Sequence, residues 1–138
     1  MTRVNLVPPE ELHDQHLFAE YRELKMVPKS LARSIAARGV PGVQRMIPPA
    51  YVLGTGHVSF FYDKGLYLAK RYTLLRAELD RRAYAYNADS ELDPDGVFRR
   101  YPQLNNDWTP TAEALALVRD RIQSRVAMKP QWYRMTVT

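Results

Sequence analysis

Apolar and aromatic residues recur at intervals of three and four positions in three separate segments of this chain, and this pattern limits its fold more than any other feature. One turn of an α-helix takes about 3.6 residues, so such spacing is typical of helices that bury one side. The three stripes are Leu17, Tyr21, Leu24, Leu31 and Ile35; Leu68, Tyr72, Leu75 and Leu79; and Leu115, Val118, Ile122 and Val126. The pattern predicts an all-α fold built on three main helices.

Residues that favour helix ends set the limits expected for the first helix. Asp14 is a good N-cap residue, and the helix should run from there toward Arg38, with Gly39 as its stop. Pro28 lies inside this span, where a proline removes one backbone hydrogen bond and clashes with the preceding turn. A kink or a restart is therefore expected within residues 27–30.

The other two helices carry end signals of the same kind. Asp63 can cap a second helix that reaches about Tyr86. Thr109 and Pro110 suit the N-cap and the first position of a third helix, which should end near Ala127. The basic residues of the second helix are expected to point largely outward: Lys64, Lys70, Arg71, Arg76, Arg81 and Arg82.

Three segments lie outside the predicted helices. Residues 1–13 should form an extended arm. Residues 39–62 end in a run too aromatic and apolar for a free loop, so they should pack over the helices as irregular structure, with His57 as a structural, hydrogen-bonding group. Residues 87–107 are acidic and contain prolines, which is typical of a surface connection. A chain of 138 residues holds one core but not two, so one compact domain is expected over all 138 residues.

The composition limits which metal sites and disulfides the protein can have and where in the cell it can be located. The chain has no cysteine, which excludes disulfides and thiolate metal sites. His13 and His16 lie three residues apart, but no third ligand clusters with them, so no metal site is predicted. No apolar run approaches the roughly 20 residues of a membrane helix, and the first residues lack the apolar core of a signal peptide. A soluble, cytoplasmic protein is expected.

The chain carries excess positive charge. Its 20 Lys and Arg against 15 Asp and Glu give a net charge of +5, which favours a polyanionic partner but also serves solubility. Arg121 and Arg125 are four residues apart on the third helix, so their guanidinium groups repel each other unless an anion lies between them. A mostly basic stripe on the first helix comprises Arg22, Met26, Lys29 and Arg33. Such a stripe is either a solvated face or an anion-binding surface.

The first residues can supply a nucleophile. If the initiator methionine is removed, the chain begins with the α-amino group of Thr2, and such a group has a pKa of about 8. Arg3 and Arg22 are candidates to lower this pKa, because nearby cations disfavour the protonated amine. A neutral amine can attack an electrophilic carbon and form an iminium, as catalytic lysines do. Many proteins begin with Met-Thr, so these two residues alone do not indicate a catalytic amine. The indication comes from the following helix, where His16 and Glu23 share a face beside the apolar stripe.

The tail carries two aromatic residues, Trp132 and Tyr133, directly after Pro130 and Gln131. Aromatic rings in such a position can stack on nucleic-acid bases. They can equally close the hydrophobic core. The sequence alone leaves both roles open.

Four separate blocks of the sequence resemble one known family. They are Met-Thr-Arg-Val-Asn-Leu (1–6), Asp-Gln-His-Leu-Phe-Ala-Glu-Tyr-Arg-Glu-Leu (14–24), Leu-Gly-Thr-Gly-His-Val-Ser-Phe-Phe-Tyr-Asp-Lys (53–64) and Pro-Gln-Trp-Tyr (130–133). In this order and spacing they resemble the pyrimidine-dimer DNA glycosylases of the phage endonuclease V type. The resemblance implies a compact helical domain whose N-terminal arm threads between the first and third helices.

The resemblance also implies roles for individual residues. Thr2 matches the family nucleophile, whose α-amino group attacks the anomeric carbon of the damaged nucleotide, displaces the base and forms an imine. Glu23 matches the carboxylate that stabilises the cationic sugar and assists the proton transfers of β-elimination. Arg3, Arg22, Arg121 and Arg125 match positions that contact phosphates. His16 matches a histidine at the lip of the site, with Gln15 beside it.

Two departures from the family pattern bear on lesion preference more than on the reaction. Relatives carry Pro-Arg where this chain has Lys25 and Met26, so one phosphate-binding arginine is missing. Lys25 and Lys29 are the candidates to replace it. After Tyr133 the tail also lacks the further tyrosines that relatives place near the substrate.

These inferences predict a bifunctional DNA glycosylase and abasic-site lyase that acts on ultraviolet-induced cyclobutane pyrimidine dimers in double-stranded DNA. It should work as a monomer in the cytoplasm, associated with the nucleoid through DNA, without a metal or an organic cofactor and without a membrane. One alternative keeps the imine chemistry but directs it at a ring-opened purine or an abasic site. The other is a non-enzymatic basic module that binds distorted DNA.

Overall fold

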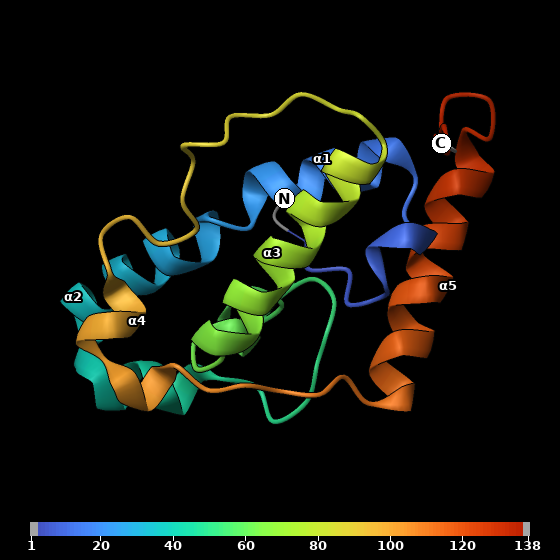
Figure 1. The fold of residues 1–138 in the computed structure, drawn as a ribbon. Coiled ribbons are helices and arrows are strands. Elements are labelled where there is room, and N and C mark those ends of the chain that lie inside the picture. Colours follow the sequence, from blue (N-terminus) through green and yellow to red (C-terminus); the bar gives the residue numbers. More distant parts are fainter. Residues whose placement is uncertain (1–2, 137–138) are drawn as a thin grey trace.

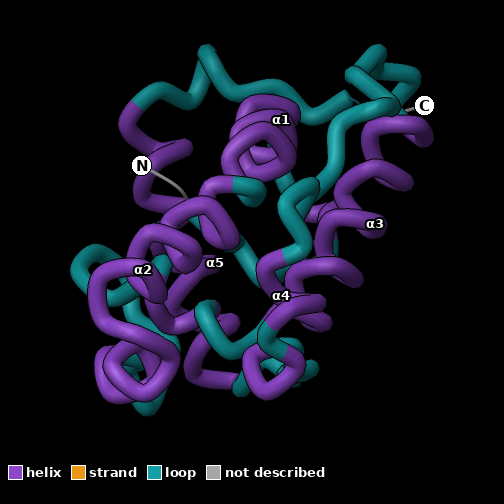
Figure 2. The backbone as a smooth tube through the Cα atoms, turned by 90° about the vertical axis from the view of Figure 1, so that its left-hand side faces the viewer, coloured by secondary structure: helices purple, strands orange, loops and turns teal. Residues whose placement is uncertain are grey.

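The computed structural model describes residues 3–136 and contains no β-strand within them. Its α-helices are α1 (Asp14–Glu23), α2 (Met26–Met46), α3 (Gly65–Arg81), α4 (Val97–Arg100) and α5 (Ala112–Met128). Short 3-10 helices are η1 (Pro9–Glu11), η2 (Ser59–Phe61) and η3 (Pro102–Leu104). Figure 2 shows this arrangement of helices joined by loops. The predicted all-α fold is confirmed.

The helix α3 lies near the centre of the molecule, with α1 packed against it and with α2 and α4 together at one end (Figure 1). The N-terminal arm, residues 3–8, and η1 run between α3 and α5 (Figure 1). An ion pair of 2.8 Å joins Glu11 of η1 to Arg119 of α5. The arm and η1 therefore connect α5 to the helices that precede it.

The predicted stripes of the first two helical segments form most of the helical part of the core. Their fully buried leucines are Leu17, Leu24, Leu31, Leu68, Leu75 and Leu79. The stripe of α5 contributes less, because only Val118 of its predicted members is buried. Leu115, Ile122 and Val126 are half-buried. One side of α5 therefore faces a space that is less enclosed than the core.

The span predicted as one helix over 14–38 is two helices. The break between α1 and α2 precedes the predicted window 27–30. Pro28 occupies the first turn of α2, where backbone N–H groups have no partner inside the helix, so the proline removes no hydrogen bond there. Gly39 ends the first helical stretch of this span, as predicted, because its backbone, with a φ of 72° and a ψ of 169°, is not helical. A second helical stretch, counted with the first as α2, continues to Met46, within the segment that the sequence predicted to be irregular.

The predicted ends of the other two long helices are also displaced. The helix α3 begins two residues after Asp63 and ends well before Tyr86. The N-cap of α5 is Thr111, whose hydroxyl accepts the backbone N–H of Ala114 at 3.1 Å, and not the predicted Thr109. Thr109 and Thr111 both precede the helix-forming run, and which of them caps the helix depends on where the backbone becomes helical.

Three charged residues are buried although the sequence pattern placed them elsewhere. Arg71 and Arg82 were predicted to point outward, but both are buried. Nε of Arg71 donates to Oε2 of Glu20 at 2.6 Å, and Nη1 of Arg82 donates to Oδ1 of Asp14 at 2.9 Å. Asp14 therefore binds a distant arginine and does not cap α1. The prediction was wrong because periodicity cannot distinguish a solvated arginine from one that reaches a carboxylate on another element.

The later part of the segment predicted as irregular, up to residue 62, packs on the core through aromatic rings. Tyr51, Phe60 and Phe61 are buried. Trp108, from the connection before α5, meets Phe60 edge-on with 5.1 Å between ring centroids. This aromatic cluster holds η2 and the irregular residues before it in place against the helices.

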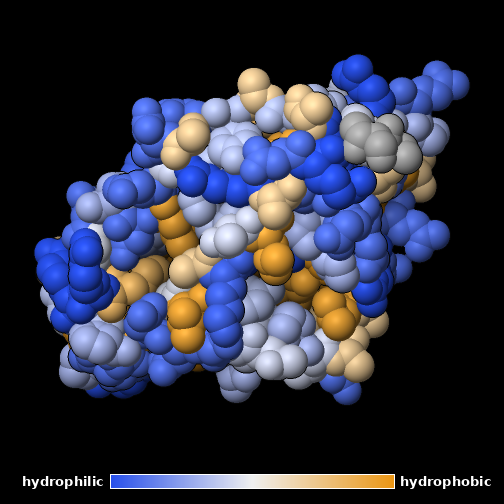
Figure 3. All heavy atoms as spheres, viewed as in Figure 1, coloured by the Kyte–Doolittle hydropathy of each residue, from blue (hydrophilic) through white to orange (hydrophobic). Residues whose placement is uncertain are grey.

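The face of the molecule in Figure 3 is mostly hydrophilic, with hydrophobic side chains only in small separate groups. The large hydrophobic side chains that are exposed are Met26, Leu66, Leu74, Leu117, Met128, Trp132 and Met135. Scattered exposure of this kind is ordinary for a folded chain. Among the helices described here, none has both the length and the apolar character needed to cross a membrane.

Candidate active site

A cleft of about 300 Å³ opens between the arm, α1, α5 and the tail. It is lined by Arg3, Asn5, His16, Ala19, Glu20, Glu23, Arg121, Ile122, Arg125 and Tyr133. The fold thus brings together predicted site residues from both ends of the chain. Those in the cleft are Arg3, His16, Glu23, Arg121, Arg125 and Tyr133.

Helical spacing explains why α1 and α5 each present several of these side chains. His16, Glu20 and Glu23 are four and three residues apart, so they share one face of α1. Arg121 and Arg125 share one face of α5 for the same reason. Since the apolar stripes beside these faces pack inward, the polar faces of the two helices line the same cleft.

Side chains, and not a strand or helix, hold the backbone of the arm. The N–H of Val4 donates to Nε2 of His57 at 2.9 Å, and the hydroxyl of Tyr51 donates to the carbonyl of Val4 at 3.0 Å. The N–H of Asn5 donates to Oε1 of Glu20 at 3.3 Å. His57 is therefore a buried, hydrogen-bonded group, as the sequence predicted.

Two carboxylates one turn apart on α1 have different surroundings. Glu20 is buried and receives two hydrogen bonds from Arg71, at 2.6 and 3.0 Å, and Arg71 also donates to the carbonyl of Val7. Glu23 is half-buried and lines the cleft. Among residues 3–136, no hydrogen-bond or ion-pair partner of its carboxylate is found. Glu20 therefore supports the fold, whereas Glu23 can act on a molecule that enters the cleft.

Three guanidinium groups give the cleft a positive potential. Burial lowers the pKa of Arg3, and the charges of Arg121 and Arg125 lower it further. Arg121 and Arg125 form no ion pair with any carboxylate in the described part of the chain. Arginines held together in this way favour an anion such as a phosphate, which removes their mutual repulsion.

One wall of the cleft is aromatic. The ring of Tyr133 stacks on His16 with 4.8 Å between centroids and 25° between planes, and it meets His13 edge-on at 5.7 Å. Burial and the neighbouring His13 lower the pKa of His16, so this imidazole is neutral at pH 7. Within residues 3–136, no group of three or more His, Cys, Asp or Glu side chains is placed to hold a metal ion.

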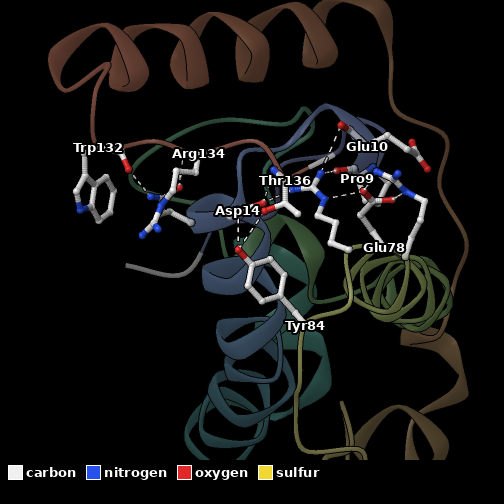
Figure 4. Close-up of polar contacts among 11 residues, drawn as sticks. Pro9, Glu10, Asp14, Glu78, Tyr84, Trp132, Arg134 and Thr136 are labelled. Atoms are coloured by element: carbon white, nitrogen blue, oxygen red, sulfur yellow. Dashed lines mark hydrogen bonds and ion pairs between the residues drawn. The ribbon is translucent and has the colours of Figure 1, made fainter. Parts of the chain in front are cut away.

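The tail that carries Tyr133 is fastened to the start of α1 by Asp14 (Figure 4). The carboxylate of Asp14 accepts hydrogen bonds from the hydroxyl of Tyr84 at 2.7 Å, from the N–H of Thr136 at 3.1 Å and from Arg82 at 2.9 Å. Burial by itself raises the pKa of Asp14, but these donors outweigh it and lower the pKa to about 2. The carboxylate is therefore charged at any physiological pH.

Gln15 adds a second fastening for the tail. Its Nε2 donates to the carbonyl of Trp132, and its Oε1 accepts the N–H of Arg134 at 3.0 Å (Figure 4). Both backbone groups flank Tyr133. Gln15 was predicted to contact DNA; in the structure it does not line the cleft and holds the backbone on both sides of Tyr133.

The remaining predicted residues are not in the cleft. Thr2 lies outside the described residues. Arg22 and Lys29 are exposed and do not line the cleft. Trp132 has 56% of its surface exposed and meets the ring of Tyr133 edge-on at 4.8 Å.

Sequence reasoning missed two residues that line the cleft, Asn5 and Glu20. It also missed the buried residues that hold the arm and α1 in place: Tyr51, Arg71 and Arg82. One signal was present in the sequence, because Glu20 lies four residues from His16 on the face that carries Glu23. A glutamate at that position reads equally as solvated. The partner that buries it, Arg71, lies 51 residues away.

Comparison with known protein families gives a match that covers the arm, α1, α2 and α3. Residues 1–92 match the family model described as pyrimidine dimer DNA glycosylase. The match includes the two positions on which the predicted chemistry depends, Thr2 and Glu23, and ends before α5 with its arginines. The chain therefore belongs to the pyrimidine dimer DNA glycosylase family and is a DNA repair glycosylase.

Proposed function

We propose that this protein cleaves the N-glycosidic bond of cyclobutane pyrimidine dimers through an imine to the α-amine of Thr2 and then nicks the strand by β-elimination. The observation that carries this proposal is the carboxylate of Glu23, which lacks a partner among residues 3–136 and shares a cleft with the start of the arm and three arginines. Such a reaction needs an amine, a carboxylate and cations that bind phosphate.

The first step is attack by the amine. The neutral α-amine of Thr2 adds to C1′ of the damaged nucleotide, the bond from C1′ to the base breaks, and the base leaves with the bonding electrons and takes up a proton. Opening of the bond between C1′ and the ring oxygen then gives the protonated imine. Glu23 stabilises the positive charge that develops on the sugar. Arg3 and its neighbours Arg121 and Arg125 favour the unprotonated amine.

The second step breaks the strand. The iminium acidifies C2′, which loses a proton, and the resulting electrons expel the 3′-phosphate. Water then hydrolyses the imine and releases the amine. Glu23 is the base assigned to C2′, because Glu20, the other carboxylate of the cleft, is held by Arg71.

Damaged duplex DNA is the partner that suits this surface. Arg121 and Arg125 bind phosphates without any need for a base sequence. A base inside a duplex cannot reach the cleft, so a nucleotide must leave the stack, and a lesion that weakens stacking lowers this cost by a few kcal/mol. The stacked rings of His16 and Tyr133 offer an aromatic surface for the extruded part.

Borohydride trapping tests the proposal. The protein is incubated separately with duplexes that carry a pyrimidine dimer, an abasic site, a ring-opened purine or no lesion, then reduced and analysed by gel and peptide mass. We expect a covalent adduct and a nick with the dimer and with the abasic site, and the adduct should map to an N-terminal peptide that begins with Thr2.

Other outcomes identify the alternatives. An adduct with the ring-opened purine but not with the dimer redirects the same chemistry to another lesion. An adduct with the abasic site alone indicates that the protein is a lyase without glycosylase activity on dimers. Tight binding to distorted duplexes without any adduct indicates the non-enzymatic module. The intact mass of the protein shows whether threonine is its first residue.

A further inference from the structure

We propose that His57 is a positioning residue for the terminal amine: together with Tyr51 it holds the Val4 residue of the arm on both sides and so sets where the chain before it can reach. This inference rests on the proposed imine mechanism. It assigns a function in catalysis to two buried residues of the segment before α3, neither of which lines the cleft.

The hydrogen bonds of Val4 determine the state of the His57 ring. Nδ1 of His57 lies 2.8 Å from the carbonyl oxygen of Val52, which can only accept, so Nδ1 carries the proton. Nε2 is then the acceptor of the Val4 N–H at 2.9 Å. The ring must therefore be neutral, since a proton on Nε2 would face another N–H group.

The second contact comes from Tyr51. Its hydroxyl donates to the carbonyl oxygen of Val4 at 3.0 Å, and its ring packs edge-on against His57 with 5.3 Å between centroids. The side chain of Val4 is fully buried as well. The N–H, the carbonyl and the side chain of this one residue are thus all held.

The residue held in this way is close to the reacting end of the chain. Two residues of extended backbone span at most about 7 Å, so a fixed Val4 restricts where the amine of Thr2 can lie. The next hydrogen bonds along the arm hold residues farther from the terminus: the N–H of Asn5 donates to Glu20, and Arg71 donates to the carbonyl of Val7. A shift of about 1 Å at a reacting group can cost about 100-fold in rate.

The surroundings of His57 make it a rigid anchor. Its side chain is 1% exposed, and its ring also meets Phe61 edge-on at 5.7 Å. It follows a turn in which Gly54 and Gly56 have φ angles of 77° and 91°, and the N–H of His57 donates to the carbonyl of Gly54 at 3.0 Å. These φ values favour glycine, so the two glycines of the sequence stabilise the turn that precedes His57.

Electrostatics support the neutral ring. Burial lowers the pKa of His57, and the positive charge of Arg3 lowers it further, against opposing effects of the hydrogen bond to Val52 and of Glu20. The groups that face the ring are thus Arg3, Glu20 and Tyr51. At pH 7 Nε2 of His57 is therefore unprotonated and can accept the N–H of Val4.

Two amide substitutions separate the contact with the arm from the contact with Val52. The amide of His57→Gln reaches the position of Nε2, so its oxygen can accept the Val4 N–H, but the bond to Val52 is lost. The amide of His57→Asn reaches only the position of Nδ1, so it keeps the bond to Val52 and loses the one to Val4. If His57 only stabilised the fold, the glutamine variant would not be more active than the asparagine variant.

The experiment measures the single-turnover rate of borohydride trapping on an abasic-site duplex, together with the affinity for the same duplex carrying a reduced abasic site. We expect His57→Asn to lower the trapping rate at least tenfold, and His57→Gln to stay within about threefold of the unsubstituted protein. Affinity should change less than about threefold in both variants. Val97→Ala, which removes buried atoms of α4 far from the arm in sequence, controls for lost stability and should trap at the unsubstituted rate.

Several results would overturn the proposal. Equal trapping rates for His57→Asn, His57→Gln and the unsubstituted protein would show that the Val4 contact does not matter. If His57→Asn does not fold, Tyr51→Phe carries the test, because it removes only the hydroxyl contact with Val4. An unchanged trapping rate in that variant would also contradict the proposed positioning of the amine through Val4. Failure of the proposed function is distinguishable, since the unsubstituted protein itself would then form no adduct at its N-terminus.

Discussion

At the scale of single residues, burial gives two carboxylates on one helix face different tasks. Glu20 is enclosed and held by Arg71, so its charge is already compensated. Glu23 lies three residues later, faces the cleft and has no partner within residues 3–136. A carboxylate that is not compensated by the protein can stabilise a cation that appears only during the reaction.

Glu23→Gln should therefore keep DNA binding and lose strand cleavage. We expect the nicking rate on a dimer-containing duplex to fall by about 100- to 1000-fold, the usual cost of removing one group that stabilises a transition state. The matched control is Glu113→Gln, an exposed glutamate in the first turn of α5. Nicking at the unsubstituted rate would remove Glu23 from the mechanism.

At the scale of elements, α5 carries arginines toward two different neighbours. Arg119 is exposed and pairs with Glu11 of η1 at 2.8 Å. Arg121 and Arg125 line the cleft and pair with no carboxylate of the described chain. One helix therefore combines an attachment to η1 with a surface that can bind phosphates.

Neutralising the cleft arginines should change the salt dependence of DNA binding. Each of Arg121→Gln and Arg125→Gln should weaken binding and reduce the slope of log K against log salt by about 0.9, the value for one phosphate contact. Arg119→Gln is the control on the same helix and should leave the slope unchanged. The measurement is a series of duplex titrations at increasing salt, and an unaltered slope for both cleft variants would place them away from the DNA.

The tail is the other element whose position the fold determines. Asp14 binds Thr136 and Tyr84, and its pKa of about 2 lies below the value of about 3.9 in an unfolded chain. A lowered pKa in the folded state adds stability that is complete above the unfolded pKa and is lost as the pH falls through the folded one. The window is therefore about pH 5 to pH 2.

Urea unfolding at several pH values tests this linkage. Between pH 5 and pH 2 the unsubstituted protein should lose about 2 kcal/mol that depends on Asp14, because one pKa unit corresponds to about 1.4 kcal/mol. Asp14→Asn should be less stable at pH 7 and should lack this part of the pH dependence. Asp95→Asn, an exposed aspartate in the connection before α4, is the control and should follow the unsubstituted protein. A parallel curve for Asp14→Asn would contradict the assigned pKa.

At the scale of the whole molecule, buried ion pairs connect the arm, α1 and α3. Arg71 of α3 reaches Glu20 of α1 and the carbonyl of Val7 in the arm. Arg82, just after α3, reaches Asp14 of α1 and the carbonyl of Pro9. These two arginines join segments that are far apart in the sequence, and they place the arm beside the cleft.

Breaking such a pair should cost far more than breaking a surface pair. Arg71→Met leaves Glu20 buried without compensation, so we expect a loss of about 3–5 kcal/mol in the free energy of unfolding. Its neighbour Lys70 pairs with Asp107 at the surface, and Lys70→Met should cost less than about 1 kcal/mol. Urea unfolding of both variants checks the difference, and equal losses would show that the Glu20 pair contributes no more than an exposed one.

Much of the helical framework could be predicted because its signal is local. The stripes of Leu17, Leu24, Leu68 and Leu75 depend on spacing within one segment, and these residues are buried as predicted. Helix ends were less predictable. Gly39 breaks the helix where the sequence predicted a stop, but a second helical stretch follows it to Met46, within residues predicted to be irregular.

The site could be predicted only in part. His16 and Glu23 share a helix face by spacing, and the resemblance to a family singled them out together with Arg121 and Arg125. Nothing in the spacing placed Tyr51 and His57 against Val4, because the residues that meet there are 47 and 53 positions apart.

The sequence by itself determined the all-α class, the apolar stripes and membership of the glycosylase family, because each of these depends on residues in a fixed order along the chain. Only the tertiary structure decided which charges are compensated: Glu20, Asp14, Arg71 and Arg82 are paired in the interior, whereas Glu23 and the arginines of α5 line the cleft. The physical reason is that Coulomb and hydrogen-bond energies depend on distance and burial, and both are set by segments that meet only after the chain has folded.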